Sequence, residues 1–376
     1  MANRETNSVD VKIPAKLPFG LRAKSLDFVL FMEWLNKRVD NLARSYMNKV
    51  YLARKIGRDL ENVLRDSCAL SITDQFWVNR SDIDMTWSKL TELKDWNEAL
   101  NDVALYGNTS NLDWEKVMAG KTSLFTTKGA FSKAILGKSM LKLGGTQERE
   151  WVASVIGKAL GLPVQDVTII NPSIKKARRK DGTFEKFFTF PITFPFSIDK
   201  THNYDDTLVE INLFTSDRIS LVHASELYSD SAFGEAHREG QHHRYFYDRL
   251  PNENLKRDFE RVLILNWLIS NHDMHGENFG CLYCPETFEI TGIPPSFDHN
   301  SADFDGTIPE LDVPDIVGDS IKHHGNIIAK IESGNLENAL KDVKSWLTED
   351  QKNGVRSVAA ELVRLYNQLT HCPTRT

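Results

Sequence analysis

The sequence of 376 residues has no long apolar run and only four cysteines. No run approaches the roughly 18 apolar residues that a membrane-spanning helix needs. The first residues, MANRETNSVDVK, lack the apolar stretch of a signal peptide. Four cysteines do not make a disulfide scaffold in a chain of this length, which indicates a reducing compartment. These absences predict a cytoplasmic protein without a membrane span.

The sequence also lacks an excess of basic charge. It has 46 Lys and Arg against 52 Asp and Glu, a formal net charge of -6, so we expect no direct binding of nucleic acid. Hydrophobic residues make up 41% of the chain, which is enough for a sizeable core and excludes wholesale disorder. Internal repeats are absent too, and the length indicates one large or two medium domains.

Changes in hydrophobic spacing divide the chain into three regions. Residues 1–120 show helical spacing near 25–65 and scattered aromatics, which predicts a mainly helical N-terminal extension packed on the next region. Residues 121–214 hold strand-like runs around one amphipathic helix, 151–160, so we expect a β-rich nucleotide-binding lobe. The strand-like runs are 139–143, 167–170, 187–190 and 207–211.

Residues 215–376 have mainly helical spacing. The run 262–269 is apolar nearly all round, as expected of a helix buried at the centre of a domain. Two further helices are expected near 335–349 and 354–370. The order of extension, β-rich lobe and helical lobe predicts an α+β fold.

The densest group of polar residues directly follows the buried run, in the segment Ser270-Asn-His-Asp-Met-His-Gly-Glu-Asn-Phe-Gly280. Such residues are costly at the end of an apolar helix unless they bind something. Asp273 and Asn278 stand five apart, the spacing at which a kinase loop presents a carboxylate to the attacking hydroxyl and an amide oxygen to Mg²⁺. A second metal carboxylate, Asp298, ends an apolar run after an expected hairpin.

The β-rich region offers residues of the type that orient nucleotide phosphates. Kinases use a strand lysine and a glutamate on the following helix. Lys142 interrupts the apolar strand 139–143, and Glu150 opens a helix eight residues later. Upstream, a polar segment surrounds Gly129, where backbone N–H groups could cradle phosphate. The candidate residues of this cradle are Thr127, Lys128, Gly129 and Ala130.

Together these residues resemble the HipA-like kinase family, distant relatives of eukaryotic protein kinases. The segment 271–278 is similar to the family's N-x-D-x-H-x-x-N catalytic loop, and Phe297-Asp298 lies where the family has its metal aspartate. The strand lysine, the helix glutamate and the closing Ala159-Leu-Gly-Leu match in order as well. The resemblance covers roughly residues 120–305.

The resemblance implies a bilobal protein-kinase-like fold that uses ATP and Mg²⁺ to phosphorylate proteins on Ser or Thr, commonly with autophosphorylation. Bacterial members often act as toxins paired with a small antitoxin, so a protein substrate and an antitoxin-like or regulatory partner are expected. By this resemblance the catalytic residues are Asp273 and His275, the magnesium ligands Asn278 and Asp298, and the nucleotide-binding residues Lys142, Glu150, Thr127, Lys128, Gly129 and Ala130.

Three other functions remain open. The pattern D-x-H-x-x-N also resembles the loop of phosphoinositide kinases, so a lipid or a small molecule is an alternative acceptor. Glu277 takes the place where the best-known family members carry a basic residue, which favours a nucleotide-binding pseudokinase acting as an interaction module. His272, Asp273 and His275 could instead be ligands of a metallohydrolase, which would leave the strand lysine and the helix glutamate without a role.

The remaining histidines and basic residues have structural interpretations. We expect His275 to brace its loop through a hydrogen bond to a backbone carbonyl. His237, His242 and His243 lie in a charged aromatic stretch and are predicted to be surface residues. The basic stretch 175–180 precedes an Asp-Gly pair and predicts a hairpin or loop tip with a solvated flank.

Overall fold

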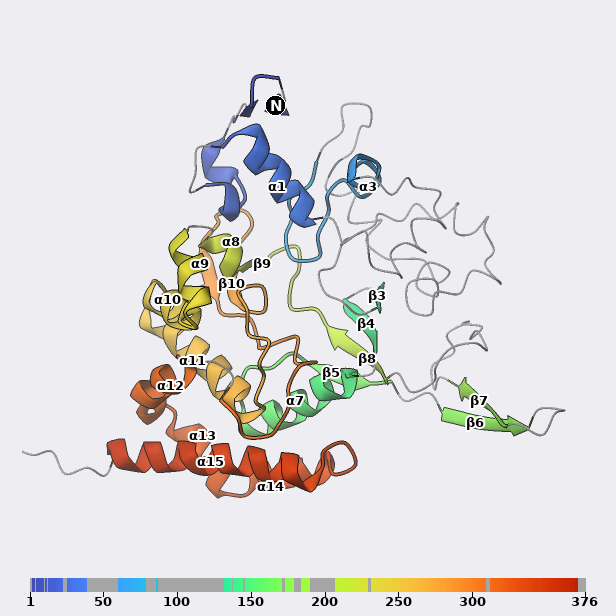
Figure 1. Cartoon of the computed structure of the whole chain (residues 1–376), viewed down its shortest axis with the longest axis vertical. Coiled ribbons are helices and arrows are strands. Elements are labelled where there is room, and N and C mark those ends of the chain that lie inside the picture. The colour runs from blue at the N-terminus through green and yellow to red at the C-terminus, as the bar shows by residue number, and fades with distance from the viewer. Residues whose placement is uncertain are drawn as a thin grey trace, which may run out of the picture. The chain divides into compact units, whose positions relative to one another are not determined.

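The computed structural model describes residues 2–3, 5–9, 11, 13–22, 26–38, 60–78, 86, 132–136, 138–144, 146–170, 173–178, 184–189, 207–228, 231–308 and 312–370. Contacts within the chain divide it into two compact units. Unit 1 comprises Met1–Gln147 and Thr168–Thr215, and unit 2 comprises Glu148–Val167 and Ser216–Thr376. Most of the labelled helices in Figure 1 belong to unit 2.

One arginine organises the first part of unit 1. Arg38, at the end of helix α1 (Phe28–Arg38), forms two hydrogen bonds of 2.7 Å with Asp74 and also donates to the carbonyls of Ala69 and Phe76. Both side chains of this ion pair are more than nine-tenths buried, and such a bidentate pair fixes α1 against the segment that contains its partners. The other elements here are β1 (Ala2–Asn3), β2 (Ser8–Val9), η1 (Pro14–Lys16), η2 (Phe19–Leu21) and α3 (Leu60–Ser67).

A four-stranded sheet completes the described part of unit 1. Its order is β3 (Ser132–Leu136), β4 (Ser139–Gly144), β8 (Thr207–Asn212) and β5 (Val167–Ile169). Strand β4 is antiparallel to β3 and to β8, and Leu141, Ile170 and Leu208 form a buried cluster. The predicted strands at 139–143, 167–170 and 207–211 are thus confirmed, and β6 (Ser173–Arg178) with β7 (Phe184–Thr189) forms the predicted hairpin.

Helix α11 (Glu253–Leu268) is the centre of unit 2. The Asn252 side chain caps its start by accepting a hydrogen bond from the backbone N–H of Leu255. Residues 262–268 are all buried, as the apolar run predicts. Helices α12 (Val313–Ser320) and α15 (Glu349–Thr370) pack against α11, and α10 (His242–Asp248) contacts it through aromatic rings.

Smaller helices complete unit 2. They are α8 (Ala224–Leu227), α9 (Ser231–Arg238), η3 (Ile321–His323), α13 (Gly325–Glu332) and α14 (Asn335–Asp342). The helix expected near 335–349 ends earlier, at Asp342, and the last helix, α15, begins at Glu349. Figure 1 shows α15 as the long red helix, and α13 packs against both α14 and α15.

Helix α7 (Gln147–Leu160) belongs to unit 2 from Glu148 onward. Gly161 ends it in the left-handed region, φ 68°, and the N–H of Leu162 bonds back to the carbonyl of Gly157. The carbonyl of Gly161 then accepts a hydrogen bond of 2.6 Å from Arg261 of α11. This link and a hydrogen bond from Asn335 to the carbonyl of Ala159 explain why α7 groups with the helical unit.

A three-stranded antiparallel sheet in unit 2 has the order β11 (Ile290–Gly292), β10 (Gly280–Tyr283) and β9 (Ser220–His223). The expected hairpin before Asp298 is therefore present as β10 and β11. Small antiparallel sheets beside a helical part confirm the α+β class. Within the described ranges, each helix is too short or too polar to span a membrane.

Candidate active site

The segment that joins α11 to β10 forms a loop with a buried base and a half-exposed tip. Asn271, at its start, is 1% exposed, and Asn278, at its end, is 8% exposed. The side chains of Asp273 and His275 are both 41% exposed. The two ends of the loop are thus buried, whereas the Asp273 carboxylate at its tip is accessible to solvent. We call residues 271–278 the catalytic loop.

Backbone hydrogen bonds bring the segment after Asp298 back to the start of the catalytic loop. The N–H of Phe304 bonds to the carbonyl of Ile269 at 3.0 Å, and the N–H of Asp303 bonds to the carbonyl of Ser270 at 3.2 Å. Asn271 also pairs with Ala302 in an antiparallel bridge. Because these bonds close the segment on the loop, Asp298 lies near enough to act electrostatically on Asp273.

The pKa of Asp273 is raised above its ordinary value. Burial is the largest cause, and the negative charge of Asp298 raises the pKa further. His275 is the main opposing influence, with hydrogen bonds from Ser301 and Asn278. Two carboxylates that destabilise each other's charge form a place where a cation would be stabilised.

Asn278 and Asp298 carry oxygen atoms suited to a hard cation. The Asn278 side chain donates from Nδ2 to the carbonyl of Asp273 at 2.6 Å, so the amide oxygen Oδ1 is left as an acceptor. Asp298 has a left-handed backbone, φ 61°, which is unusual for a non-glycine residue and is found at functional sites. Asn300 donates to Asp298 Oδ1 at 3.1 Å. Carboxylate and amide oxygens fit Mg²⁺, which takes its other ligands from water and substrate phosphates.

His275 braces the catalytic loop through a backbone amide. Its Nδ1 accepts a hydrogen bond of 3.2 Å from the N–H of Glu277, whereas a carbonyl partner was expected. With Nδ1 as the acceptor, the neutral ring carries its hydrogen on Nε2. Nε2 lies 3.5 Å from Asp273 Oδ1, so the ring faces the carboxylate that the sequence suggests as the base.

A chain of buried polar side chains beneath the loop was not predicted from the sequence. Asn271 Nδ2 donates to Asn266 Oδ1, and Asn266 Nδ2 donates to Ser296 Oγ, both at 2.8 Å. Ser296 Oγ lies 2.7 Å from His299 Nε2, and Asn271 Oδ1 accepts from the N–H of Asp273 at 3.3 Å. We call Asn266, Asn271, Ser296 and His299 the amide network; each of these residues is at most 4% exposed.

The amide network joins the two segments that carry the candidate catalytic and metal residues. Ser296 also pairs through its backbone with residues 163–165, which follow α7. The available sequence signal was Asn266, a lone amide inside the apolar run 262–269. A buried amide in such a run needs hydrogen-bond partners, so its position points to a polar network.

The prediction that His242 and His243 are surface residues is wrong. They are 1% and 0% exposed, because α10 turns them toward the aromatic rings of Phe259 and Phe279. Both Nε2 atoms contact the backbone carbonyl of Met274, at 2.8 and 3.1 Å.

The two nucleotide-orienting candidates lie in different units. Lys142 is 3% exposed on β4 of unit 1, directly opposite Lys133 of β3, which is 4% exposed. Glu150 is 1% exposed on α7 of unit 2. Their ion pair stays a prediction. Nothing in the sequence pattern marks Lys133 as a second buried lysine, because strand register alone brings it beside Lys142.

Two further predictions concern the residues of the phosphate cradle and the ligands of a metallohydrolase. Thr127, Lys128, Gly129 and Ala130 lie outside the described residues. The metallohydrolase ligand set is not supported, because His272 Nε2 lies 2.8 Å from Thr307 Oγ1. In addition, the part of the chain that the structure describes holds no group of three His, Cys, Asp or Glu residues able to bind a metal.

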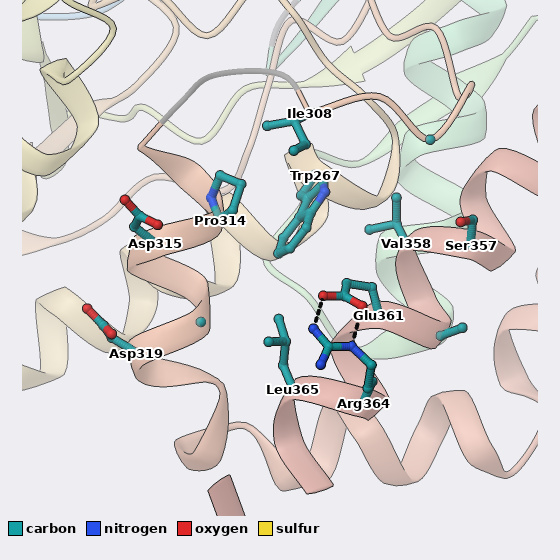
Figure 2. Close-up of a pocket in the computed structure, with 13 residues that line it drawn as sticks. Trp267, Ile308, Pro314, Asp315, Asp319, Ser357, Val358, Glu361, Arg364 and Leu365 are labelled. Atoms are coloured by element: carbon teal, nitrogen blue, oxygen red, sulfur yellow. Dashed lines mark hydrogen bonds and ion pairs between the residues drawn. The ribbon is translucent and has the colours of Figure 1, made fainter. Parts of the chain in front are cut away.

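A cavity of about 750 Å³ lies between the end of α11, α12 and α15. Figure 2 shows Trp267 near the centre of the lining, below Ile308, with Asp315 and Asp319 on the α12 side. None of the candidate catalytic or metal residues lines it. The cavity is therefore a feature separate from the candidate active site.

No family model matches the chain, and no curated protein matches its sequence. Solved structures are similar to it at low identity. The Helicobacter pylori proinflammatory kinase CtkA is 15% identical with a TM-score of 0.41, covering 64% of this chain and 94% of that chain. A chain of the Shewanella oneidensis MR-1 toxin–antitoxin complex of HipA, HipB and operator DNA is 14% identical with a TM-score of 0.42, covering 87% and 82%. The Golgi casein kinase is 12% identical with a TM-score of 0.37, covering 87% and 90%.

Proposed function

We propose that the protein is an ATP- and Mg²⁺-dependent phosphotransferase, a Ser/Thr protein kinase of HipA-like type. The observation that carries this proposal is the convergence of three residues in unit 2: Asn278 contacts Asp273, and Asp298 lies near enough to raise its pKa. Phosphoryl transfer needs this combination of a base and metal ligands.

Each residue of the catalytic loop has a role in the proposed reaction. Asp273 takes the proton of the acceptor hydroxyl, and its raised pKa makes it a stronger base than an exposed aspartate. The Nε2–H of His275 faces Asp273 Oδ1 and orients the carboxylate. Asn278 and Asp298 would hold Mg²⁺, which when bound neutralises charge on the transferred phosphate.

The nucleotide and the partners belong to the same proposal. Lys142 and Glu150 would orient the phosphates of ATP, and residues 127–130 would cover them. A protein substrate, autophosphorylation and an antitoxin-like or regulatory partner follow from the resemblance, whereas the cytoplasmic location rests on the low cysteine content. The acceptor hydroxyl is the least constrained part, because the loop pattern also suits a lipid or a small molecule.

A nucleotide-binding pseudokinase is the second candidate function. Glu277 favours it, since this half-buried acid lies beside the magnesium ligand Asn278 and would repel phosphate unless a cation compensates. Such a protein would bind ATP but transfer no phosphate.

Label transfer from γ-labelled ATP tests the proposal. The full chain is incubated with Mg²⁺ and a generic Ser/Thr protein, and label is followed into both proteins. We expect transfer that Asp273→Asn reduces by about 10²- to 10⁴-fold. Asp258→Asn, at a half-exposed aspartate on α11, is the matched control and should keep full transfer. Binding of ATP without transfer supports the pseudokinase, and absence of binding contradicts both.

A further inference from the structure

Two buried histidines of α10 converge on one carbonyl of the catalytic loop. His242 Nε2 lies 2.8 Å and His243 Nε2 lies 3.1 Å from the backbone oxygen of Met274. Met274 stands between Asp273 and His275, and its side chain is buried, 2% exposed. A contact that holds this carbonyl also fixes the peptide plane between Met274 and His275, which directly follows the candidate base Asp273.

The hydrogen bonds of His243 determine its charge. Its Nδ1 lies 2.9 Å from Asp312 Oδ1, while its Nε2 faces the Met274 carbonyl. A carbonyl oxygen and an ionised carboxylate are both acceptors, so both ring nitrogens must carry hydrogen. Both contacts are satisfied when His243 is an imidazolium ion paired with Asp312.

The surroundings agree with an ionised Asp312. Its Oδ2 accepts a hydrogen bond of 2.8 Å from the N–H of Arg244. Burial would raise the pKa of Asp312, but the hydrogen bond and charge of His243 hold it below its ordinary value. Burial, with the charge of His243 next, lowers the pKa of His242 to about 4, so His242 is the neutral donor to Met274.

We propose that the ion pair of His243 and Asp312 is a positioning element of the active site, which holds the Met274 carbonyl and thereby aims Asp273 and His275. This inference rests on the proposed phosphotransferase function. Asp312 follows Asp298 along the chain, at the start of α12, so the pair ties the segment beyond the candidate metal ligand to the catalytic loop. The pair acts through Met274 and does not touch the reacting groups.

The Asp312 carboxylate is the counter-ion of His243, and the rings of His242, Phe259 and Phe279 pack around His243. The ring of His242 lies 4.0 Å away on the same helix, and His237 of α9 faces His242 at 4.6 Å. Phe259 of α11 and Phe279 after the loop cover the other sides. Replacing the Asp312 carboxylate by an amide removes the charge that stabilises the imidazolium in this apolar setting. One of the two hydrogen bonds of His243 is then lost.

The experiment compares Asp312→Asn with Asp315→Asn, an exposed aspartate on the same helix. We expect Asp312→Asn to lower kcat of label transfer about 10- to 100-fold, as for other residues that orient a catalytic group, with KM for ATP unchanged. Asp312→Glu keeps the charge and should recover part of the rate. The control Asp315→Asn should have wild-type kcat. An active chain in which Asp312→Asn has the same kcat as the control overturns the positioning role alone.

A second measurement needs no variant and tests the ion pair itself. Nitrogen-15 NMR of histidine-labelled wild-type protein should show hydrogen on both ring nitrogens of His243 at neutral pH, and on one nitrogen of His242. A neutral His243 overturns the inference even if every variant fails to fold. A wild-type chain that transfers no label overturns the proposed function and, with it, the positioning role, whereas the NMR result would still decide the ion pair.

Discussion

The catalytic loop rests on two sets of buried polar groups, and they differ in charge. The amide network holds the loop at its start, where Asn271 accepts from the N–H of Asp273. The histidine cluster, by which we mean His242, His243 and Asp312, holds it one residue later, at the carbonyl of Met274. The first consists mainly of amide and hydroxyl groups, and the second contains an ion pair.

Because of this difference, the amide network and the histidine cluster should respond differently to pH and to the loss of one partner. Amide and hydroxyl hydrogen bonds keep their strength across the pH range in which proteins are folded, since these groups do not titrate. A buried ion pair depends on the charge of both partners, and the loss of one partner leaves an uncompensated charge. The amide bonds of Asn266 and Asn271 should therefore supply constant geometry, while the ion pair of the cluster makes the loop sensitive to pH.

The largest expected effect comes from breaking the ion pair. Asp312→Ala leaves His243 without its counter-ion and should lower the free energy of unfolding by about 3 to 5 kcal/mol. Urea denaturation at neutral pH measures this loss, and Asp315→Ala on the same helix serves as control. A loss no greater than that of the control would mean that the cluster does not stabilise the fold through its charge.

Lowering the pH should have the second largest effect on stability, and it should act through the histidine cluster. His242 has a pKa of about 4 in the folded chain, against an ordinary value of 6.5, so the unfolded chain binds more protons between these values. The free energy of unfolding therefore falls as the pH falls from 6.5 toward 4, by at most about 3 kcal/mol from this group. His242→Gln should flatten that part of the pH dependence, whereas the exposed His323→Gln should not. Equal slopes for both variants would rule out this origin of acid sensitivity.

Breaking the amide network should cost less and be independent of pH. Asn266→Ala removes a partner from Asn271 and from Ser296, and a buried group left without its partner costs about 1 to 3 kcal/mol. We expect the same loss at pH 5 and at pH 8 by urea denaturation. A loss that changes between the two pH values would show that His299, the titratable member of the network, takes part in this support.

The smallest effect is expected from an exposed ion pair. Arg356 of α15 forms two hydrogen bonds, 2.9 and 3.0 Å, with Glu337 of α14, but the Glu337 side chain is 47% exposed. Glu337→Gln should lower the free energy of unfolding by less than about 1 kcal/mol, and less again in high salt. A cost equal to that of Asp312→Ala would remove the contrast between buried and exposed pairs.

The sequence predicts those parts of the fold that depend on periodicity. The apolar run 262–269 identifies the central helix, and the runs at 139–143 and 207–211 identify two adjacent strands of the sheet. Helix ends are less well predicted, since they depend on local capping and packing. The start of the last helix, at Glu349, is an example.

The candidate site is predictable as far as spacing alone determines it. Asp273 and Asn278 share one loop, and Asp298 follows the next hairpin, so their proximity follows from chain order. The supports of the loop depend on contacts distant in sequence. Histidines in a charged stretch have the local sequence pattern of surface residues, and only the packing of α10 shows that His243 is buried.

The most direct test of the central claim is the effect of Mg²⁺ on ATP binding, because it does not depend on knowing the acceptor. Calorimetric titration of ATP into the full chain, with Mg²⁺ and with a chelator, should show binding that requires the metal. Asp298→Asn should weaken that binding at least about tenfold, while Asp303→Asn, half-exposed nearby, should not. Equal ATP affinity in Asp298→Asn and in wild type, or no binding by wild type, would contradict the claim that Asp298, Asn278 and Asp273 form one centre for phosphoryl transfer.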